Sequence, residues 1–420
     1  MRLVLLGLLS LPSVAWGHAG DMIESLDVHP PQADFGSAGL ESSIGWLWAE
    51  NGEDYSWVCH EAVTGPESLL TPRYIRSASG FTLAAVARSG EGREEGETLY
   101  RSTDHCDWNA VQGLTGRVVQ ELSIDPAAPD TVFLVVNHPE ESAENGVFLS
   151  TDAGLTFSAT PLGASDRLFR SVLAKQGVVW ATSVDSGGKE AFVYRSRDHG
   201  ETWEEWSIDT SDKASPPDVL VLDIHPDGVW FRVTQTLEDD LWLLDDGGPR
   251  RVYSSDTKLM SGAQTEADGL VASLWGKGIG RFDGTTMSVI EGSPLSYQVR
   301  EQGGVLYAAS RPLFNNFGMM TSTNGVDFEG AFSYDQLGSP PTCEAETHST
   351  QFCDPLWETL AERLKRAEPA DTGDTGDSGD TGEVIEPHRG CVGKKKNQGW
   401  LLFALPVLWF PWRKKRHRQT

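Results

Sequence analysis

A short turn pattern recurs four times along this chain and limits the folds that it can adopt. Two complete copies read Ser-x-Asp-x-Gly-x-Thr followed by Trp or Phe, and two other copies are one residue shorter. The copies start at residues 102, 150, 196 and 322, so the intervals are 48, 46 and 126 residues, and the last equals three steps of 42. A repeat of about 40–50 residues built from short strands is typical of a β-propeller, with one four-stranded blade per repeat.

A structural role explains each residue type in this turn. The Asp side chain can accept hydrogen bonds from backbone N–H groups, as in an Asx turn. The Gly permits a positive φ, and we expect the final aromatic residue to start the next strand and to pack between blades. We therefore predict a scaffold role for all of these positions, which are Ser102, Asp104, Trp108, Ser150, Asp152, Gly154, Thr156, Phe157, Ser196, Asp198, Gly200, Thr202, Trp203, Ser322, Asn324, Gly325 and Phe328.

The pattern resembles the Asp-box, or BNR, repeat of sialidases, sortilin-type receptors and related propellers. The resemblance implies an all-β propeller over residues 37–334, with the boxes away from the catalytic or binding face. Apolar and β-branched runs separated by Gly, Asp and Asn turns predict seven blades, of which the fifth and sixth lack the box. Six blades are the alternative, if residues 37–64 form only a capping arm. We expect the ring to close by pairing strands from both ends of the chain, which protects exposed edges.

The start of the chain has the pattern of a secretory signal peptide. Met1-Arg2 precedes an apolar run, and the small residues Ala15 and Gly17 suit cleavage after residue 17, with cleavage after Ala19 as the alternative. Residues 18–36 then form an N-terminal arm. The net charge is −27, and no basic footprint for nucleic acid is present, so we expect no DNA or RNA partner. This acidity suits a soluble, extracytoplasmic protein.

The five cysteines predict two disulfides in the exported body. Four of them allow three pairings. Cys59 and Cys106 fall near matching ends of consecutive blades, which favours that pair and leaves Cys343 and Cys353 to close a short loop. Zinc is the alternative, but no Cys-x-x-Cys spacing is present. We expect neither a metal nor another cofactor.

Residues 335–368 predict a disulfide loop followed by an amphipathic helix. Asp354 suits the N-cap of a helix over residues 355–366. Its apolar face would pack on the propeller as a lid, and a partner-binding helix is the alternative; the face consists of Leu356, Trp357, Leu360, Ala361 and Leu364. Residues 369–389 contain a Thr/Ser-Gly-Asp repeat without apolar side chains, which predicts an extended linker.

Residues 390–420 combine Cys391, an apolar stretch over residues 400–412 and a basic end over residues 413–418. As a helix, 13 residues would reach about 20 Å, less than the roughly 30 Å of a bilayer core. The segment resembles the myxobacterial sorting tag, which a membrane protease of the myxosortase kind cuts near its cysteine. The resemblance implies processing at Cys391 and display at the cell surface or outer membrane, after anchoring in the inner membrane. The basic spacer Lys394–Lys396 and the short apolar stretch depart from the tag. The alternatives are a plain tail anchor and an incidental disulfide partner at Cys391.

The sequence assigns no catalytic residue. Sialidases use an arginine triad, a Tyr nucleophile and carboxylates, but their early Arg-Ile-Pro signature is absent here. The nucleophile elbow, the His-Glu-x-x-His pair and the phosphate loop are absent as well. We therefore expect a surface-displayed binding or scaffold module for an extracellular glycan or protein. The alternatives are a surface glycoside hydrolase and a structural envelope component. Most of the 15 tryptophans should fill blade interfaces, and an exposed one could stack on a sugar or a peptide.

Overall fold

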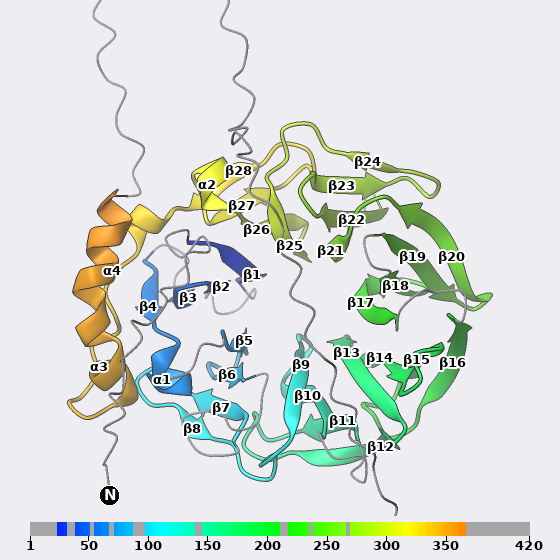
Figure 1. Ribbon diagram of the computed structural model, residues 1–420, viewed down its shortest axis with the longest axis horizontal. Helices are drawn as coiled ribbons and strands as arrows, with labels where there is room; N and C mark the ends of the chain where they lie inside the picture. Colours follow the sequence, from blue (N-terminus) through cyan, green and yellow to red (C-terminus); the bar gives the residue numbers. More distant parts are fainter. Residues whose placement is uncertain are drawn as a thin grey trace, which may run out of the picture. The chain divides into compact units, whose positions relative to one another are not determined.

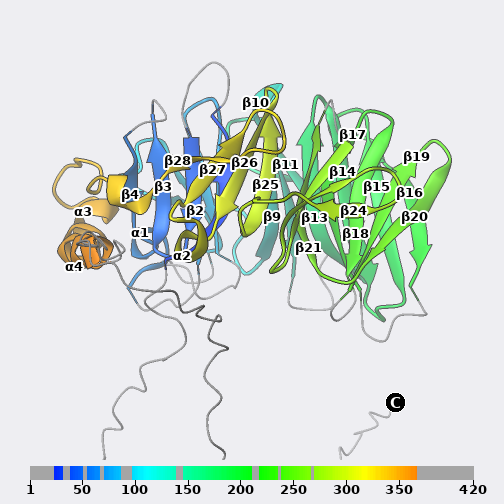
Figure 2. The same cartoon turned by 90° about the horizontal axis from the view of Figure 1, so that it is seen from above.

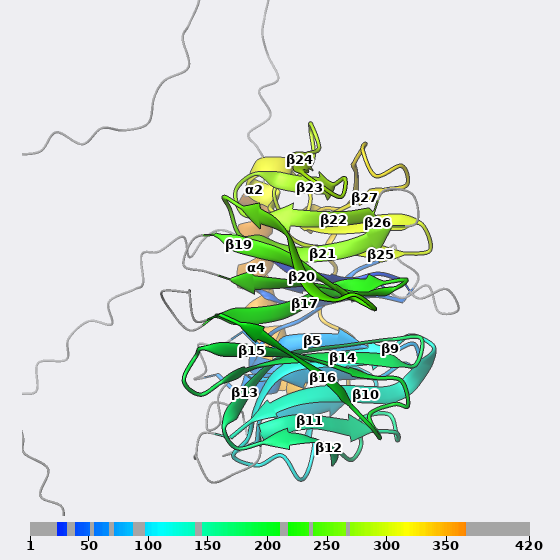
Figure 3. The ribbon, with the colours of Figure 1, turned by 90° about the vertical axis from the view of Figure 1, so that its right-hand side faces the viewer.

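The described residues form a seven-bladed β-propeller. The computed structural model describes residues 23–31, 38–50, 54–66, 71–86, 97–138, 145–210, 217–234, 238–265 and 269–366. Their strands make seven four-stranded antiparallel sheets around a common axis (Figure 1). The strands run across the thickness of the ring (Figure 2), and the sheets have the usual twist of propeller blades (Figure 3). The prediction of seven blades is confirmed, and the six-bladed alternative is wrong.

Each blade consists of four consecutive strands, the first of which is innermost (Figure 1). Blade 1 contains β1 (Ser25–His29), β2 (Ala38–Ser42), β3 (Gly45–Ala49) and β4 (Ser56–Val58). Blade 2 contains β5 (Arg73–Arg76), β6 (Thr82–Ala85), β7 (Leu99–Ser102) and β8 (Asn109–Ala110). Blade 3 contains β9 (Val118–Asp125), β10 (Ala128–Asn137), β11 (Asn145–Ser150) and β12 (Ser158–Ala164).

Blades 4 to 7 repeat this order. Blade 4 contains β13 (Arg167–Lys175), β14 (Val178–Asp185), β15 (Glu190–Ser196) and β16 (Glu204–Asp209). Blade 5 contains β17 (Asp218–His225), β18 (Gly228–Thr234), β19 (Asp239–Asp245) and β20 (Gly248–Ser255). Blade 6 contains β21 (Leu259–Thr265), β22 (Gly269–Leu274), β23 (Gly278–Phe282) and β24 (Met287–Val289). Blade 7 contains β25 (Ser296–Gln302), β26 (Val305–Ser310), β27 (Met319–Ser322) and β28 (Glu329–Phe332).

The core lies between neighbouring blades, and strand β10 shows why. Its run Val132–Val136 is buried throughout, because blades cover both faces of this sheet. Successive side chains point to opposite faces. Val132 and Leu134 accordingly join the cluster shared with blade 2, whereas Phe133 and Val135 join the cluster shared with blade 4. A continuous apolar strand is therefore the expected sequence at such a position.

The ring closes differently from our expectation. No blade in the described part of the chain takes strands from both ends, since blade 1 and blade 7 each come from one continuous segment. Blade 1 begins at β1, inside the segment that we predicted as an arm. Side chains join the two blades instead. Arg300 bonds Asp27 at 3.0 and 2.7 Å, Arg311 bonds Glu24 at 2.8 Å, and the hydroxyl groups of Ser25 and Tyr334 lie 2.9 Å apart.

Both disulfides connect the ring to the segment that follows blade 7. The bonds join Cys59 to Cys353 and Cys106 to Cys343, so the predicted pairing of Cys59 with Cys106 and of Cys343 with Cys353 is wrong. The physical reason is the path of the segment, which crosses blades 1 and 2. There the backbone N–H of Ser349 donates to the Cys106 carbonyl at 3.0 Å.

The helices are short and peripheral. They are α1 (Glu61–Thr64), α2 (Pro312–Asn315), the 3₁₀ helix η1 (Tyr334–Gln336), α3 (His348–Phe352) and α4 (Asp354–Arg366). Helix α4 matches the predicted amphipathic helix and lies beside blade 1 (Figures 1 and 2). Leu360 and Leu364 are buried in the core cluster of blade 1, and the Trp357 and Trp57 ring centroids are 5.7 Å apart. Leu356 departs from the predicted apolar face, because it is exposed.

Several predicted segments lie outside the described residues. They are the signal peptide over residues 1–17, the linker over residues 369–389 and the sorting tag over residues 390–420, including Cys391. Within the ranges that the structure describes, no helix combines the length and the apolar character needed to cross a bilayer.

Candidate functional site

The recurring turns connect the third and fourth strands of blades 2, 3, 4 and 7. In blade 3, Oδ1 of Asp152 accepts hydrogen bonds from the N–H groups of Leu155 and Thr156 at 3.1 and 2.9 Å. Oδ2 of Asp152 accepts from the Thr156 hydroxyl at 2.6 Å. Gly154, with φ of 76°, donates its N–H to the Ser150 hydroxyl at 3.0 Å. The turn therefore has the internal bonding that its residue types predict.

The same chemistry recurs in the other copies. Asp198 accepts from the N–H and hydroxyl of Thr202 at 2.9 and 2.5 Å. Asp104 accepts from the N–H of Cys106 at 2.9 Å, and Asn324 accepts from the N–H of Val326 at 2.9 Å. Hydrogen bonds from Thr156 and Thr202 lower the pKa of Asp152 and Asp198, respectively, to about 2.

The remaining motif residues belong to the same turns. The Ser102, Ser196 and Ser322 hydroxyls donate to the third residue of their own turns. Gly200 and Gly325 have φ of 90° and 72°. The four closing aromatic residues pack into inter-blade clusters, where Trp108 is fully buried and the others are half-buried; these are Trp108, Phe157, Trp203 and Phe328.

Blade 6 keeps the chemistry of the turn without the motif, and the motif pattern does not predict this turn. Asp283 lies between β23 and β24 and accepts from the N–H groups of Thr285 and Thr286, each at 2.8 Å. These bonds hold the pKa of Asp283 well below its usual range. The Asp-Gly pair after an apolar strand is the sequence signal that could have identified this turn.

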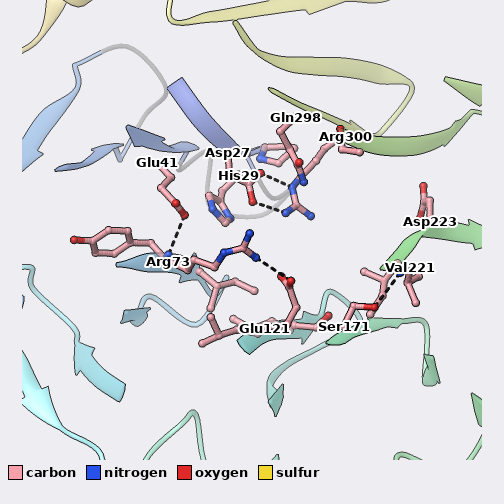
Figure 4. A pocket seen from close by; sticks show the side chains of 18 of the residues that line it. Asp27, His29, Glu41, Arg73, Glu121, Ser171, Val221, Asp223, Gln298 and Arg300 are labelled. Carbon is pink, nitrogen blue, oxygen red and sulfur yellow. Dashed lines mark hydrogen bonds and ion pairs between the residues drawn. The ribbon is translucent and has the colours of Figure 1, made fainter. Parts of the chain in front are cut away.

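A cavity of about 590 Å³ lies at the axis of the ring. All seven innermost strands contribute to its wall. The lining is polar and carries both signs of charge (Figure 4); among its residues are Asp27, His29, Glu41, Arg73, Glu121, Ser171, Lys175, Asp223, Gln298 and Arg300. This volume is within the usual range for a small-ligand pocket. We call this cavity the channel.

Three cations in the channel are paired with carboxylates of the protein itself. Arg300 makes a two-point contact with Asp27, as described above, and joins β25 to β1 (Figure 4). Arg73 bonds Glu121 at 2.9 Å between β5 and β9, and Lys175 lies 3.4 Å from Asp223. Each pair is neutral as a whole, and each joins two adjacent blades. The Arg300–Asp27 pair joins the last blade to the first.

Burial gives the channel carboxyl groups different protonation states. Burial raises the pKa of Glu41 to about 8, against the opposing effect of Arg73, so Glu41 is mostly protonated at pH 7. Burial alone would also raise the pKa of Asp27, but the Arg300 guanidinium brings it below its usual value. Burial lowers the pKa of His29 to about 4, which leaves that imidazole neutral. The channel thus holds both a carboxylic acid and a carboxylate.

None of the channel residues was singled out from the sequence. Asp27 and Arg300 are 273 positions apart, and neither belongs to a local motif. The only sequence feature common to both is that each is a polar residue within an innermost strand. Polar residues occur in many solvent-exposed strands as well, so this feature does not identify the channel. In the described part of the chain, no group of three or more His, Cys, Asp or Glu side chains is arranged to hold a metal ion.

A ring of seven four-stranded blades around a channel defines the chain as a seven-bladed β-propeller protein. No protein-family model matches the chain, and neither does any curated protein. A structure from a study of two prolyl endopeptidases is similar, with a TM-score of 0.49 and 9% identity over 73% of this chain and 49% of that one. This chain therefore spans about half the length of that relative.

Two other solved structures show the same general similarity. U3-55K matches with a TM-score of 0.43 and 9% identity, over 70% of this chain and 92% of that one. The Hadza microbial sialidase Hz136 matches with a TM-score of 0.40 and 14% identity, over 70% and 72%. At these identities the assignment of the fold rests on the sheet topology, and we take no function from these proteins.

Proposed function

We propose that this chain is an exported propeller of the Asp-box type that binds an extracellular glycan or protein at the cell surface. The observation that carries the proposal is the polar channel in a ring held by two disulfides. Its volume suits a small ligand or a protruding side chain, and its main cations are already paired with carboxylates. Such a wall offers hydrogen bonds without a strong net attraction for anions. The disulfides also suit an oxidising compartment.

Four turns with the bonding described above support the Asp-box assignment. The proposed route to the surface begins with the signal peptide and ends with processing at Cys391 by a sorting protease. Its test is the variant Cys391→Ala, followed by cell fractionation and protease shaving of intact cells. We expect this variant to stay in the membrane fraction. Unchanged surface display would contradict the sorting proposal.

One observation favours a glycoside hydrolase as the second candidate. Protonated Glu41 and ionised Asp27 both line the channel. Glycoside hydrolases usually use two carboxyl groups whose pKa values differ. In that case Glu41 would protonate the leaving oxygen.

One experiment separates the two candidates. The full chain, purified with its disulfides formed, is incubated with surface polysaccharides and a sialoside panel, and released reducing ends and free sialic acid are measured. An active glycosidase provides the positive control. Binding without turnover supports the binding module. Turnover that Glu41→Gln abolishes, and that the exposed-site control Asp256→Asn retains, would establish the hydrolase instead.

A further inference from the structure

One tryptophan in the described part of the chain is exposed, in contrast to the tryptophans that pack between blades. Trp275 is 51% exposed and lies in the turn between β22 and β23. Phe314, 57% exposed, lies on α2, between β26 and β27. Both connections join the second and third strands of adjacent blades. They therefore lie at the same end of the strands, and blade topology brings both rings to one face of the propeller.

A row of stacked groups connects these two rings. The ring centroids of Trp275 and Tyr297 are 5.7 Å apart. The Arg311 guanidinium carbon lies 5.4 Å from the Tyr297 centroid and 5.0 Å from the Phe314 centroid. We call these four residues, together with Glu24, the aromatic platform.

Hydrogen bonds fix the centre of the platform. The Tyr297 hydroxyl donates to one oxygen of Glu24 at 2.9 Å, and Arg311 donates to the other oxygen at 2.8 Å. The side chain of Asn315 donates to the Leu295 and Arg311 carbonyls, each at 3.1 Å, and so ties α2 to blade 7. A ligand would therefore find groups that are already ordered, which lowers the entropic cost of binding.

The chemistry of the platform suits a neutral sugar. Exposed aromatic faces cover the apolar face of a sugar ring, while polar groups beside them bond its hydroxyls. Arg311 and Glu24 keep about a quarter of their side chains exposed, and a carboxylate that accepts two hydrogen bonds still has free acceptor sites. Because this pair has no net charge and the chain carries −27, an anionic polymer gains nothing here.

The same geometry is less suited to a peptide. Strand addition needs an open strand edge, whereas the platform is built from a turn, a short helix and the start of an inner strand. The Tyr297 hydroxyl already donates to Glu24, so it is not free to bond a peptide carbonyl.

We propose that the aromatic platform binds a neutral oligosaccharide, with sugar rings stacked on Trp275 and Phe314 and hydroxyl groups bonded to Glu24 and Arg311. This inference rests on the proposed binding function and names its ligand class. It also places the contact on one face of the propeller, beside the channel, whose wall includes Tyr297.

The test uses the full chain, oxidised, in titrations with cello-, xylo-, manno- and malto-hexaose and with a decaproline peptide. Calorimetry gives the affinity, and quenching or a blue shift of tryptophan fluorescence reports on Trp275. We expect at least one hexaose to bind, and Trp275→Ala and Phe314→Ala each to weaken binding tenfold or more. Trp275→Phe should retain part of the affinity. Leu155→Ala is the matched control, because Leu155 is exposed in a turn at the opposite end of the strands.

The outcomes separate this inference from the general proposal. Because the substituted side chains are exposed, unchanged thermal unfolding would confirm that the variants are folded. Glycan binding that persists in Trp275→Ala and Phe314→Ala would overturn the platform and leave the binding function standing. Binding of decaproline alone would replace the glycan with a peptide. Binding to none of the hexaoses would overturn the inference.

Discussion

Arg300 on β25 donates two hydrogen bonds to Asp27 on β1, at 3.0 and 2.7 Å, and so connects the innermost strands of the last and first blades. These two blades share no strand, so the contact is part of what keeps the ring closed. In the propeller arrangement that we expected, backbone hydrogen bonds within a shared sheet hold the first and last parts of the chain together. Here two charged pairs, Arg300 with Asp27 and Arg311 with Glu24, a hydrogen-bonded hydroxyl pair and two disulfides replace them.

Loss of this pair should destabilise the fold. We expect Arg300→Ala to lower the free energy of unfolding by about 1–3 kcal/mol, because the buried Asp27 carboxyl group would lose the guanidinium that compensates its charge. The effect is smaller than for a fully buried pair, since the two side chains are 36% and 23% exposed. Urea unfolding at pH 7 measures it. Arg250→Ala, which breaks an exposed pair with Asp245, should cost less than about 1 kcal/mol. Equal effects would contradict a closing role for Arg300.

The disulfide between Cys59 and Cys353 should make a large contribution, because it spans 294 residues. The double variant Cys59→Ala, Cys353→Ala should lose about 2–5 kcal/mol of unfolding free energy. Urea unfolding, with the reduced wild-type chain for comparison, tests this. Peptide mapping without reductant should recover Cys59 with Cys353 and Cys106 with Cys343. A peptide pair joining Cys59 to Cys106 would refute the observed connectivity.

Replacing a turn Asp with Asn should cost less stability than replacing it with Ala. Asp152→Ala removes the side-chain acceptor of the Leu155 and Thr156 N–H groups, and we expect a loss of about 1 kcal/mol. Asp152→Asn should lose less, because Asn324 makes the equivalent bonds in blade 7. Thermal unfolding of both variants gives the comparison. Asp227→Ala, at an exposed position, should change stability by less than about 0.5 kcal/mol. The prediction fails if the two Asp152 variants behave alike.

Acid should destabilise the protein partly through its buried imidazoles. Burial lowers the pKa of both His29 and His60 to about 4, from 6.5. Each histidine therefore contributes stability that is fully present above pH 6.5 and is lost as the pH falls toward 4, by up to about 1.4 kcal/mol per pH unit. Urea unfolding between pH 4 and 7 should show a shallower slope for His60→Gln than for the wild-type chain. An unchanged slope would show that His60 is protonated in the folded state.

Glu41 should make the free energy of unfolding depend on pH in the opposite direction. Its pKa is raised from 4.5 to about 8, so its contribution to stability is fully present below pH 4.5 and is lost as the pH rises through 8. Glu41→Gln keeps the shape without titrating. We expect this variant to be more stable than the wild-type chain by about 1–3 kcal/mol at pH 8 and similar to it at pH 4.5, as measured by urea unfolding. A variant that is less stable at both pH values would mean that Glu41 is ionised in the channel.

The local features of the fold could be predicted from sequence to a useful degree. The bonding of Asp152 involves residues within four positions, and strand β10 shows its buried environment in its own apolar run. Helix α4 is similarly local, because its length and apolar spacing lie within a single segment. Asp283 was missed only because its turn lacks the Ser and the aromatic residue of the motif.

The sequence by itself thus determined the strands, the turns that repeat with the blades and the number of blades, because each of these depends on interactions between residues close together in the chain. Only the tertiary structure decided the partners of Cys59 and Cys106, the contact of Arg300 with Asp27 and the gathering of charged side chains in the channel. Those pairs are separated by 294, 237 and 273 residues. A local pattern carries no information on such a separation, because the closing of the ring decides which distant side chains meet.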